Sequence, residues 1–256
     1  MAVQFDAVKE VTDAFTLMFK RRNWLLGAPT VASLFLIVVV IGAVVLLTLG
    51  PEFLRELTGS TQQPSISTAR IIAFAVATTV GIFLAVAVSA FSYAWTLVAA
   101  EPVWLGHDPA WDRGFNRAAA KIVTLLAYYV LVGLMALVSF ITIVGPIVIA
   151  FFTMYGPAYI LFADKSATEA ISASFRLASE NIVPTLILVA AFMVVYFMGL
   201  IVQLVLGWIP FFGIIVNFGF QWLFSAYIAL AVVRFYEILN AASGQPPFQL
   251  VPPTTV

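Results

Sequence analysis

Ile182–Val233 reads IVPTLILVAAFMVVYFMGLIVQLVLGWIPFFGIIVNFGFQWLFSAYIALAVV and contains no Asp, Glu, Lys or Arg. Three other long stretches are equally free of charge: Trp24–Leu49, Ile71–Ala100 and Ile122–Ala163. A charged side chain at the centre of a bilayer costs at least ~2.5–3.5 kcal/mol. A water-soluble protein has no comparable reason to exclude charge over such lengths. The four stretches therefore predict an integral membrane protein.

The composition excludes several classes of function. Hydrophobic residues make up 63% of the chain and charged residues 9%, whereas about a quarter of the residues in soluble domains are charged. The formal net charge is zero, so no basic field favours nucleic acid as a partner. The absence of cysteine excludes thiol nucleophiles and thiolate metal sites, and the single histidine, His107, excludes a multi-histidine metal site. We expect no catalytic residue, no cofactor and no bound metal.

The charge-free stretches divide into six spans, because a helix needs ~20 apolar residues to cross a bilayer. The two longest stretches each fit two spans, with turns at Gly145-Pro146 and at Gly207–Pro210, since proline cannot continue a helix interior and glycine accepts positive φ. The predicted fold is a single all-α membrane domain over residues 1–240, with six transmembrane helices in three hairpins. The expected spans are 24–49, 71–100, 122–144, 146–163, 183–207 and 210–233. Residues 241–256 carry two Pro-Pro pairs and predict a short disordered tail.

Basic residues set the expected orientation, because Lys and Arg accumulate in cytoplasmic loops. With the N-terminus inside, only Arg55 and Arg70 of the 12 basic residues lie outside, both in the loop Gly50–Arg70. The other ten fall in the cytoplasmic segments. We therefore expect a multi-pass protein of the inner, cytoplasmic membrane with both termini in the cytoplasm.

An amphipathic segment precedes each predicted hairpin. The three segments are Val3–Arg22, Pro109–Lys121 and Ser166–Asn181, and each has apolar residues at helical spacing. Such helices can lie flat in the membrane interface with the apolar face down. Each even-numbered span also carries a tyrosine near its inner end, at Tyr93, Tyr159 and Tyr227. These features favour a triplicated unit of one amphipathic helix and one hairpin, although tyrosines at span ends also serve as plain interfacial anchors.

The passage Tyr155–Asn181, YGPAYILFADKSATEAISASFRLASEN, resembles the signature of YciC-like six-helix membrane proteins, a group related to the membrane domain of some glycerophosphodiester phosphodiesterases. The matching pattern is an aromatic-rich span end with proline, a polar turn, and then Ala-Ile/Leu-x-x-Ser-x-x-Leu. The residues that match it are Pro157, Ala170, Ile171, Ser174 and Leu177. The resemblance implies a prokaryotic inner-membrane protein. It does not imply phosphodiesterase activity, because the soluble catalytic domain of those enzymes is absent from the sequence.

Small residues recur every four positions along the second predicted span. They are Ala73, Ala77, Gly81, Ala85 and Ser89. Side chains four apart share one helix face, and a face without bulk lets another helix approach closely. We expect this stripe to face a helix, either inside the monomer or across a homodimer seam.

Polar and irregular positions within the spans are few. Gln203, Asn217 and Gln221 in the last hairpin either join helices by hydrogen bonds or line a substrate cleft. Gly156-Pro157 interrupts the fourth span, as a simple kink or as the broken helix of a transporter. A last group of polar residues, expected at the inner face, is read as loop residues beside span ends rather than an acid–base cluster: Glu101, His107, Asp108, Asp112 and Asp164.

Together these features predict a non-enzymatic membrane protein that organises a membrane complex or the local lipid environment. The alternative is a passive or facilitative transporter of a lipid or another apolar small molecule. The expected partners are the lipid bilayer and either another membrane protein or a second copy of the chain.

Overall fold

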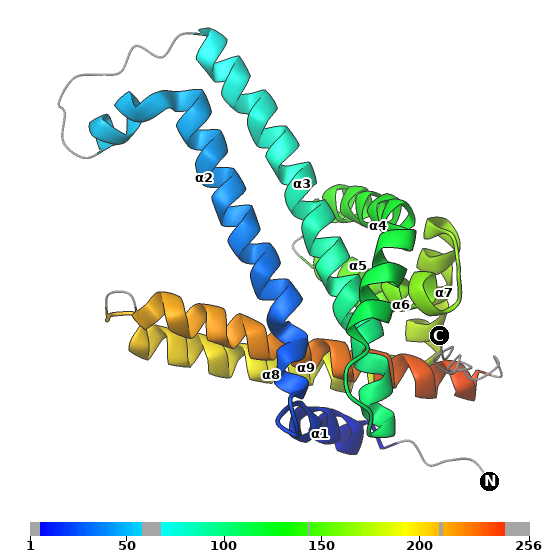
Figure 1. The fold of residues 1–256 in the computed structure, drawn as a ribbon. Coiled ribbons are helices and arrows are strands. Elements are labelled where there is room, and N and C mark those ends of the chain that lie inside the picture. Colours follow the sequence, from blue (N-terminus) through cyan, green and yellow to red (C-terminus); the bar gives the residue numbers. More distant parts are fainter. Residues whose placement is uncertain (1–5, 58–67, 143, 210–211, 244–256) are drawn as a thin grey trace. The chain divides into compact units, whose positions relative to one another are not determined.

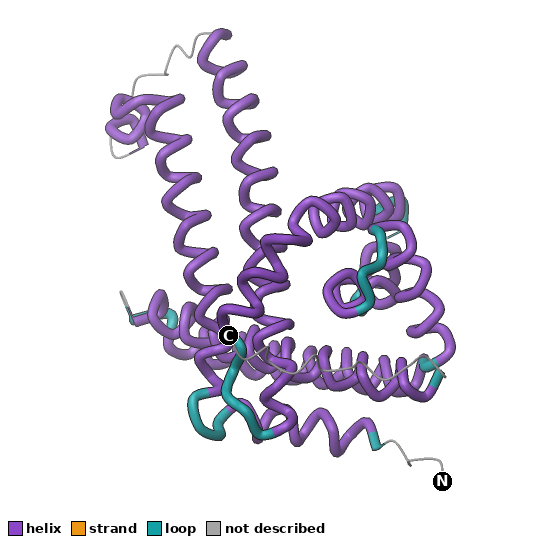
Figure 2. Tube along the Cα trace, turned by 45° about the vertical axis from the view of Figure 1, so that its right-hand side comes forward, coloured by secondary structure: helices purple, strands orange, loops and turns teal. Residues whose placement is uncertain are grey.

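The computed structural model describes residues 6–57, 68–142, 144–209 and 212–243, and within these ranges all regular structure is helical (Figures 1 and 2). Six stretches of the described chain are long and apolar enough to cross a membrane. They are Asn23–Val44, Ile72–Leu105, Trp111–Ser139, Gly145–Phe162, Ile182–Leu206 and Phe212–Ala242. The chain is thus a helical, multi-pass membrane protein.

The α-helices are α1 (Ala7–Met18), α2 (Ala28–Leu57), α3 (Thr68–Ala100), α4 (Trp111–Ser139), α5 (Gly145–Thr153), α6 (Gly156–Phe162), α7 (Ala167–Glu180), α8 (Ile182–Leu206) and α9 (Phe212–Ala242). Two short 3-10 helices, η1 (Asn23–Gly27) and η2 (Glu101–Leu105), precede α2 and follow α3. The chain forms two compact units. One comprises residues 1–31 and 90–256, and the other residues 32–89.

Several helix bounds differ from the sequence-based expectation. α4 runs without a break from Trp111 to Ser139, so the amphipathic segment 109–121 and the third span are one helix. α2 continues past Pro51 to Leu57, into the predicted outer loop, and its last turns bend away from the helix axis in Figure 1, as proline inside a helix produces. α9 extends to Ala242, while most of the predicted tail, 244–256, lies outside the described residues.

The turn predicted at Gly145-Pro146 lies instead just before these residues, which begin α5. Proline fits the first turn of a helix, where its missing N–H would have no partner anyway. Gly145 does not use a positive φ, which among the described glycines occurs only at Gly106. Glycine is needed here because the backbone at residue 145 lies close to the end of α4: a Cβ would be 2.1 Å from the carbonyl oxygen of Ser139.

Local capping fixes the two short amphipathic helices α1 and α7. The Asp6 carboxylate accepts a hydrogen bond from the backbone N–H of Lys9 at the start of α1. Ser166 and Glu169 form a capping box at the start of α7, in which the Glu169 carboxylate accepts from the backbone N–H of Ser166 at 2.9 Å. The Ser166 hydroxyl, which donates to the Glu169 carboxylate at 2.7 Å, and then the Ser166 backbone N–H hold the pKa of the Glu169 carboxyl below its usual range.

The core of the larger unit lies where these amphipathic segments meet the ends of the long helices. α1 packs on α8 and α9, and the Arg234 guanidinium of α9 donates to the Glu10 carboxylate of α1 at 2.8 Å. The start of α4 contacts the end of α3, where the Trp95 indole N–H donates to the carbonyl oxygen of Trp111 at 2.9 Å. α7 packs on α4, α5 and α6. Each amphipathic segment thus contacts the second span of a hairpin. The start of α4 contacts α3, α7 contacts α6, and α1 contacts α9, the last span of the chain.

All five residues of the small-residue stripe of α3 lie in the smaller unit. Ala73 and Ser89 are exposed, and a Cβ at Gly81 would meet no heavy atom within 4 Å apart from its own helix backbone. Gly81 itself is buried, yet an added Cβ would find open space among the described residues. The expectation that another helix packs there stays a prediction.

Candidate functional site

The fourth span is broken in the middle. α5 ends at Thr153 and α6 begins at Gly156, with Met154 and Tyr155 between the two helices. Pro157 lies in the first turn of α6 and has no N–H to donate back to α5. A break of this kind leaves backbone groups without helical partners, and in a membrane these must be satisfied by the protein itself.

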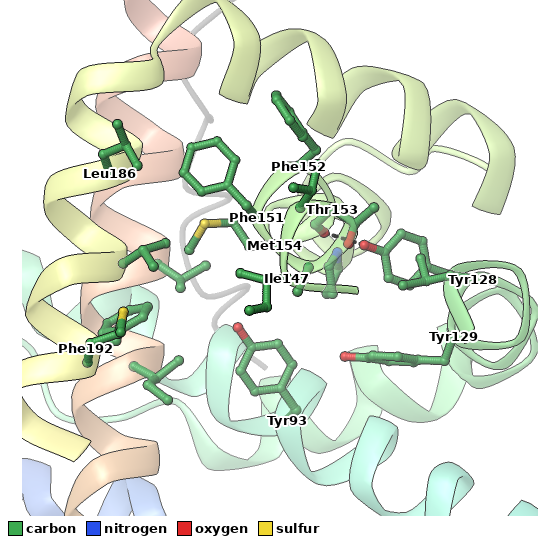
Figure 3. Close-up of a pocket in the computed structure, with 18 of the residues that line it drawn as sticks. Tyr93, Tyr128, Tyr129, Ile147, Phe151, Phe152, Thr153, Met154, Leu186 and Phe192 are labelled. Carbon is green, nitrogen blue, oxygen red and sulfur yellow. Dashed lines mark hydrogen bonds between the residues drawn. The ribbon is translucent and has the colours of Figure 1, made fainter. Parts of the chain in front are cut away.

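Side chains from α4 and α7 supply the missing partners. The Ser174 hydroxyl of α7 donates to the carbonyl oxygen of Phe152 at 2.7 Å and accepts from the backbone N–H of Tyr155 at 3.1 Å. The Tyr128 hydroxyl of α4 donates to the carbonyl oxygen of Thr153 (Figure 3). Ser174 and Tyr128 are both buried. The break is therefore a built feature that holds α4, α5, α6 and α7 together.

Gly156 makes room for this arrangement. A Cβ at Gly156 would lie 2.3 Å from the hydroxyl oxygen and the ring of Tyr128. No side chain larger than hydrogen fits there unless Tyr128 moves. Glycine at the start of α6 is thus required by close approach and not by backbone conformation.

A cavity of ≈ 790 Å³ lies beside the break. It is lined by residues of α4, α5 and α8, with contributions from α3, α6 and α9, and all of these residues belong to the larger unit. Figure 3 shows Phe151, Met154, Leu186 and Phe192 around it. Its volume is in the range of pockets that enclose small organic ligands, ~300–1,000 Å³.

The cavity wall is apolar, and none of the described residues that line it is Asp, Glu, Lys, Arg or His. Four lining residues carry hydroxyl groups. Thr153 donates to the carbonyl oxygen of Ile149 at 2.7 Å, and Tyr128 bonds to Thr153 as described above. The other two are Tyr93 of α3 and Tyr129 of α4, whose hydroxyls point into the cavity in Figure 3.

The cavity opens onto the apolar surface of the helices that line it. Ile147, Leu186 and Met193 line it and are also more than half exposed. Such exposure of large apolar side chains is expected where a protein faces hydrocarbon. The cavity is therefore bordered by exposed apolar side chains.

An ion-pair cluster closes the end of α6. The Asp164 carboxylate lies 2.5 Å from the Lys121 ammonium and 2.8 Å from the Arg117 guanidinium, both on α4. Arg117 also donates to the carbonyl oxygen of Leu161 at 2.8 Å. Hydrogen bonds from Lys121 and then Arg117 hold the pKa of the Asp164 carboxyl below its usual range. The cluster anchors the second half of the broken span to α4.

The structure separates the acidic residues that the sequence grouped at the inner face. Glu101 is buried and pairs with Arg113, whereas Asp164 pairs with Lys121 and Arg117. His107 lies exposed on the loop after η2. No group of three or more His, Cys, Asp or Glu that could hold a metal ion occurs in the described ranges.

The suggested polar lining does not reach this cavity. Gln203 and Gln221 are partly buried, Asn217 is exposed, and none of the three lines the cavity beside the break. The family-like motif does reach it. Pro157 lines the cavity, Ser174 bridges the break, and Ala170 and Leu177 are buried where α7 packs on its neighbours, with Ile171 partly buried beside them.

The sequence reading missed Tyr128, Tyr129 and the cavity itself. Tyr128 and Tyr129 lie in the middle of an apolar span, where a tyrosine is not an interfacial anchor and must find a hydrogen-bond partner. The position of these two tyrosines, far from both ends of the apolar span, was the sequence signal that could have identified them as candidate site residues.

Comparison with protein-family models, with curated proteins and with solved structures finds no match to this chain.

Proposed function

We propose that this protein binds an apolar molecule of the bilayer in the cavity beside the α5–α6 break and thereby organises its local lipid environment. The observation that supports this function is the cavity itself: ≈ 790 Å³, uncharged and open towards exposed apolar side chains of α5 and α8. An apolar void of this size favours a hydrocarbon occupant, because water would find too few polar partners there. The activity is binding and not catalysis.

The test is the content of the purified protein. The intact chain, extracted in a mild detergent, is expected to carry a co-purified apolar molecule that organic extraction and mass spectrometry can quantify per chain. Ala150 lines the cavity, so Ala150→Phe is expected to lower this content several-fold. Ala190→Phe, at an exposed position of α8 that does not line the cavity, is the matched control and is expected to leave it unchanged. Equal content in the two variants, or none in the unmodified protein, would overturn the proposal.

The proposal places the protein in the cytoplasmic membrane with both termini inside, on the ten-to-two distribution of basic residues. The cysteine-free sequence allows a direct test with Ser60→Cys, in the predicted outer loop and outside the described residues. This thiol is expected to react with an impermeant reagent added to intact cells. Reaction only after the cytoplasmic side is opened would reverse the topology.

Facilitated movement of the bound molecule is the second candidate, favoured by the broken span at the cavity. A YciC-like relationship is compatible with either function, and it implies no substrate or catalytic residue that would favour one of them. In reconstituted vesicles, transport predicts protein-dependent exchange of a labelled lipid between leaflets, with Ala150→Phe slower than Ala190→Phe. Cavity binding without any exchange would leave the organising function and reject transport.

A further inference from the structure

The geometry points to a neutral lipid with one uncharged oxygen function, a hydroxyl or a carbonyl, as the occupant of the cavity, held by the hydroxyls of Tyr93 and Tyr129. This inference rests on the proposed binding function and specifies its ligand. It excludes phospholipids and fatty-acid anions as the preferred occupants.

The two tyrosines approach the cavity from different helices. Tyr93 lies near the inner end of α3 and Tyr129 on α4, and both hydroxyls point into the same space in Figure 3. The rings are fixed by packing against the core, and the Tyr129 ring lies edge-on to Tyr128, with ring centroids 5.4 Å apart. Preorganised groups lose little entropy on binding, so this pair is suited to hold a ligand.

Neither hydroxyl has a hydrogen-bond partner among the described residues, in contrast to Tyr128 and Thr153 on the same wall. A tyrosine hydroxyl inside an apolar environment normally finds a partner, because leaving it unpaired costs about 1–3 kcal/mol. A ligand oxygen between the two would satisfy both. A carbonyl can accept from both, while a hydroxyl can accept from one tyrosine and donate to the other.

The charge of the wall decides against ionic head groups. Among the described residues, tyrosine is the only ionisable type that lines the cavity, so a phosphate or carboxylate would be desolvated without a counter-charge. The hydroxyls of Tyr128 and Thr153 are already bonded to backbone carbonyls, and the other lining side chains are apolar. The occupant that fits is therefore a chain with a single neutral polar end.

The test uses the intact protein in phosphatidylcholine nanodiscs and three photoreactive probes of equal chain length. The probes end in a hydroxyl, a methyl group or a carboxylate, and cross-linked peptides show where each one sits. The hydroxyl probe is expected to label peptides of α4, α5 and α8 at a half-saturating mole fraction roughly tenfold lower than the methyl probe, the effect of two net hydrogen bonds. The carboxylate probe is expected to bind no better than the methyl probe.

The double variant Tyr93→Phe/Tyr129→Phe removes two oxygen atoms and keeps the rings. It is expected to abolish the preference for the hydroxyl probe while the methyl probe binds as before. Tyr196→Phe, on α8 and away from the cavity, is the control and is expected to keep the preference. Equal binding of all three probes, or a preference that survives the double variant, overturns the inference but leaves apolar binding intact. Failure of every probe to label the cavity overturns the proposed function itself.

Discussion

The Tyr128 hydroxyl of α4 donates a hydrogen bond to the carbonyl oxygen of Thr153, the last residue of α5. This bond pairs a backbone group that the break between α5 and α6 leaves without a helical partner. It also holds Tyr128 against Gly156, the first residue of α6. One side chain thereby couples three helices, and substitutions around it give the sharpest tests of the fold.

Gly156→Ala is expected to destabilise the protein by about 1–3 kcal/mol, because the new methyl group would displace Tyr128 and break its hydrogen bond. The measurement is thermal or denaturant unfolding in detergent. Gly133→Ala on α4 is the matched control, since a Cβ there meets nothing within 4 Å. Equal stability of the two variants would contradict the close approach.

Ser174→Ala is expected to cost about 1–3 kcal/mol, because it leaves the carbonyl of Phe152 and the N–H of Tyr155 unpaired in a buried place. The same unfolding assay measures it. Ser179→Ala lies on the same helix, at an exposed position whose hydroxyl bonds only within α7, and should change stability little. The idea that Ser174 bridges the break fails if both substitutions are neutral.

Gly27→Ala is expected to loosen α1 and η1 from α9, because its Cβ would lie 1.9 Å from the carbonyl oxygen of Trp222, a backbone atom that cannot move alone. Trypsin should then cleave the Lys20–Arg22 segment several-fold faster than in the unmodified protein. Gly219→Ala, on α9 with open space at its Cβ, serves as the control. Cleavage at an unchanged rate would argue against tight docking of η1.

Asp164→Asn tests the ion pairs that hold α6 to α4. The folded-state pKa of Asp164 is lowered, so its stabilisation is present above the ordinary aspartate pKa of about 4 and is lost as the pH falls through the folded value. The variant should be less stable at neutral pH, by less than about 1 kcal/mol because the carboxylate is 59% exposed, and the two proteins should converge in acid. Asparagine tolerates the positive φ of 55° at this position, so backbone strain does not confound the comparison. Exposed Asp108→Asn is the control, and a constant difference at all pH values would refute the assignment.

Gly81→Leu tests the small-residue stripe. A Cβ at Gly81 would meet nothing within 4 Å among the described residues, so the prediction concerns a second helix packed on the stripe, and a leucine there should weaken that association by about 1–3 kcal/mol. Analytical ultracentrifugation in detergent measures the change. Val80→Leu lies about 100° round the helix and should be milder. If Gly81→Leu and Val80→Leu weaken association equally, the stripe is not a helix-packing interface.

The sequence predicts the fold well where the local composition and spacing of one segment determine its secondary structure. The absence of charged residues locates six membrane-length stretches, and the predicted amphipathic segment Ser166–Asn181 begins within a residue of the start of α7. Bounds are less accurate where neighbours intervene, as at Gly145, where contact with Ser139 and not a positive φ explains the glycine. The cavity escapes prediction because six helices contribute to it, and no periodicity in one helix shows which faces of the others converge.

The cavity opens sideways, where Ile147, Leu186 and Met193 are exposed. This opening determines in which unit the concentration of a competing ligand must be expressed. A molecule arriving through this opening leaves one hydrocarbon phase for another and crosses no aqueous layer. Occupancy then follows the mole fraction of that molecule in the leaflet, and not its concentration in bulk water. Apparent dissociation constants expressed per volume of buffer would rise in proportion to the amount of diluting lipid, whereas constants expressed as mole fractions would stay the same.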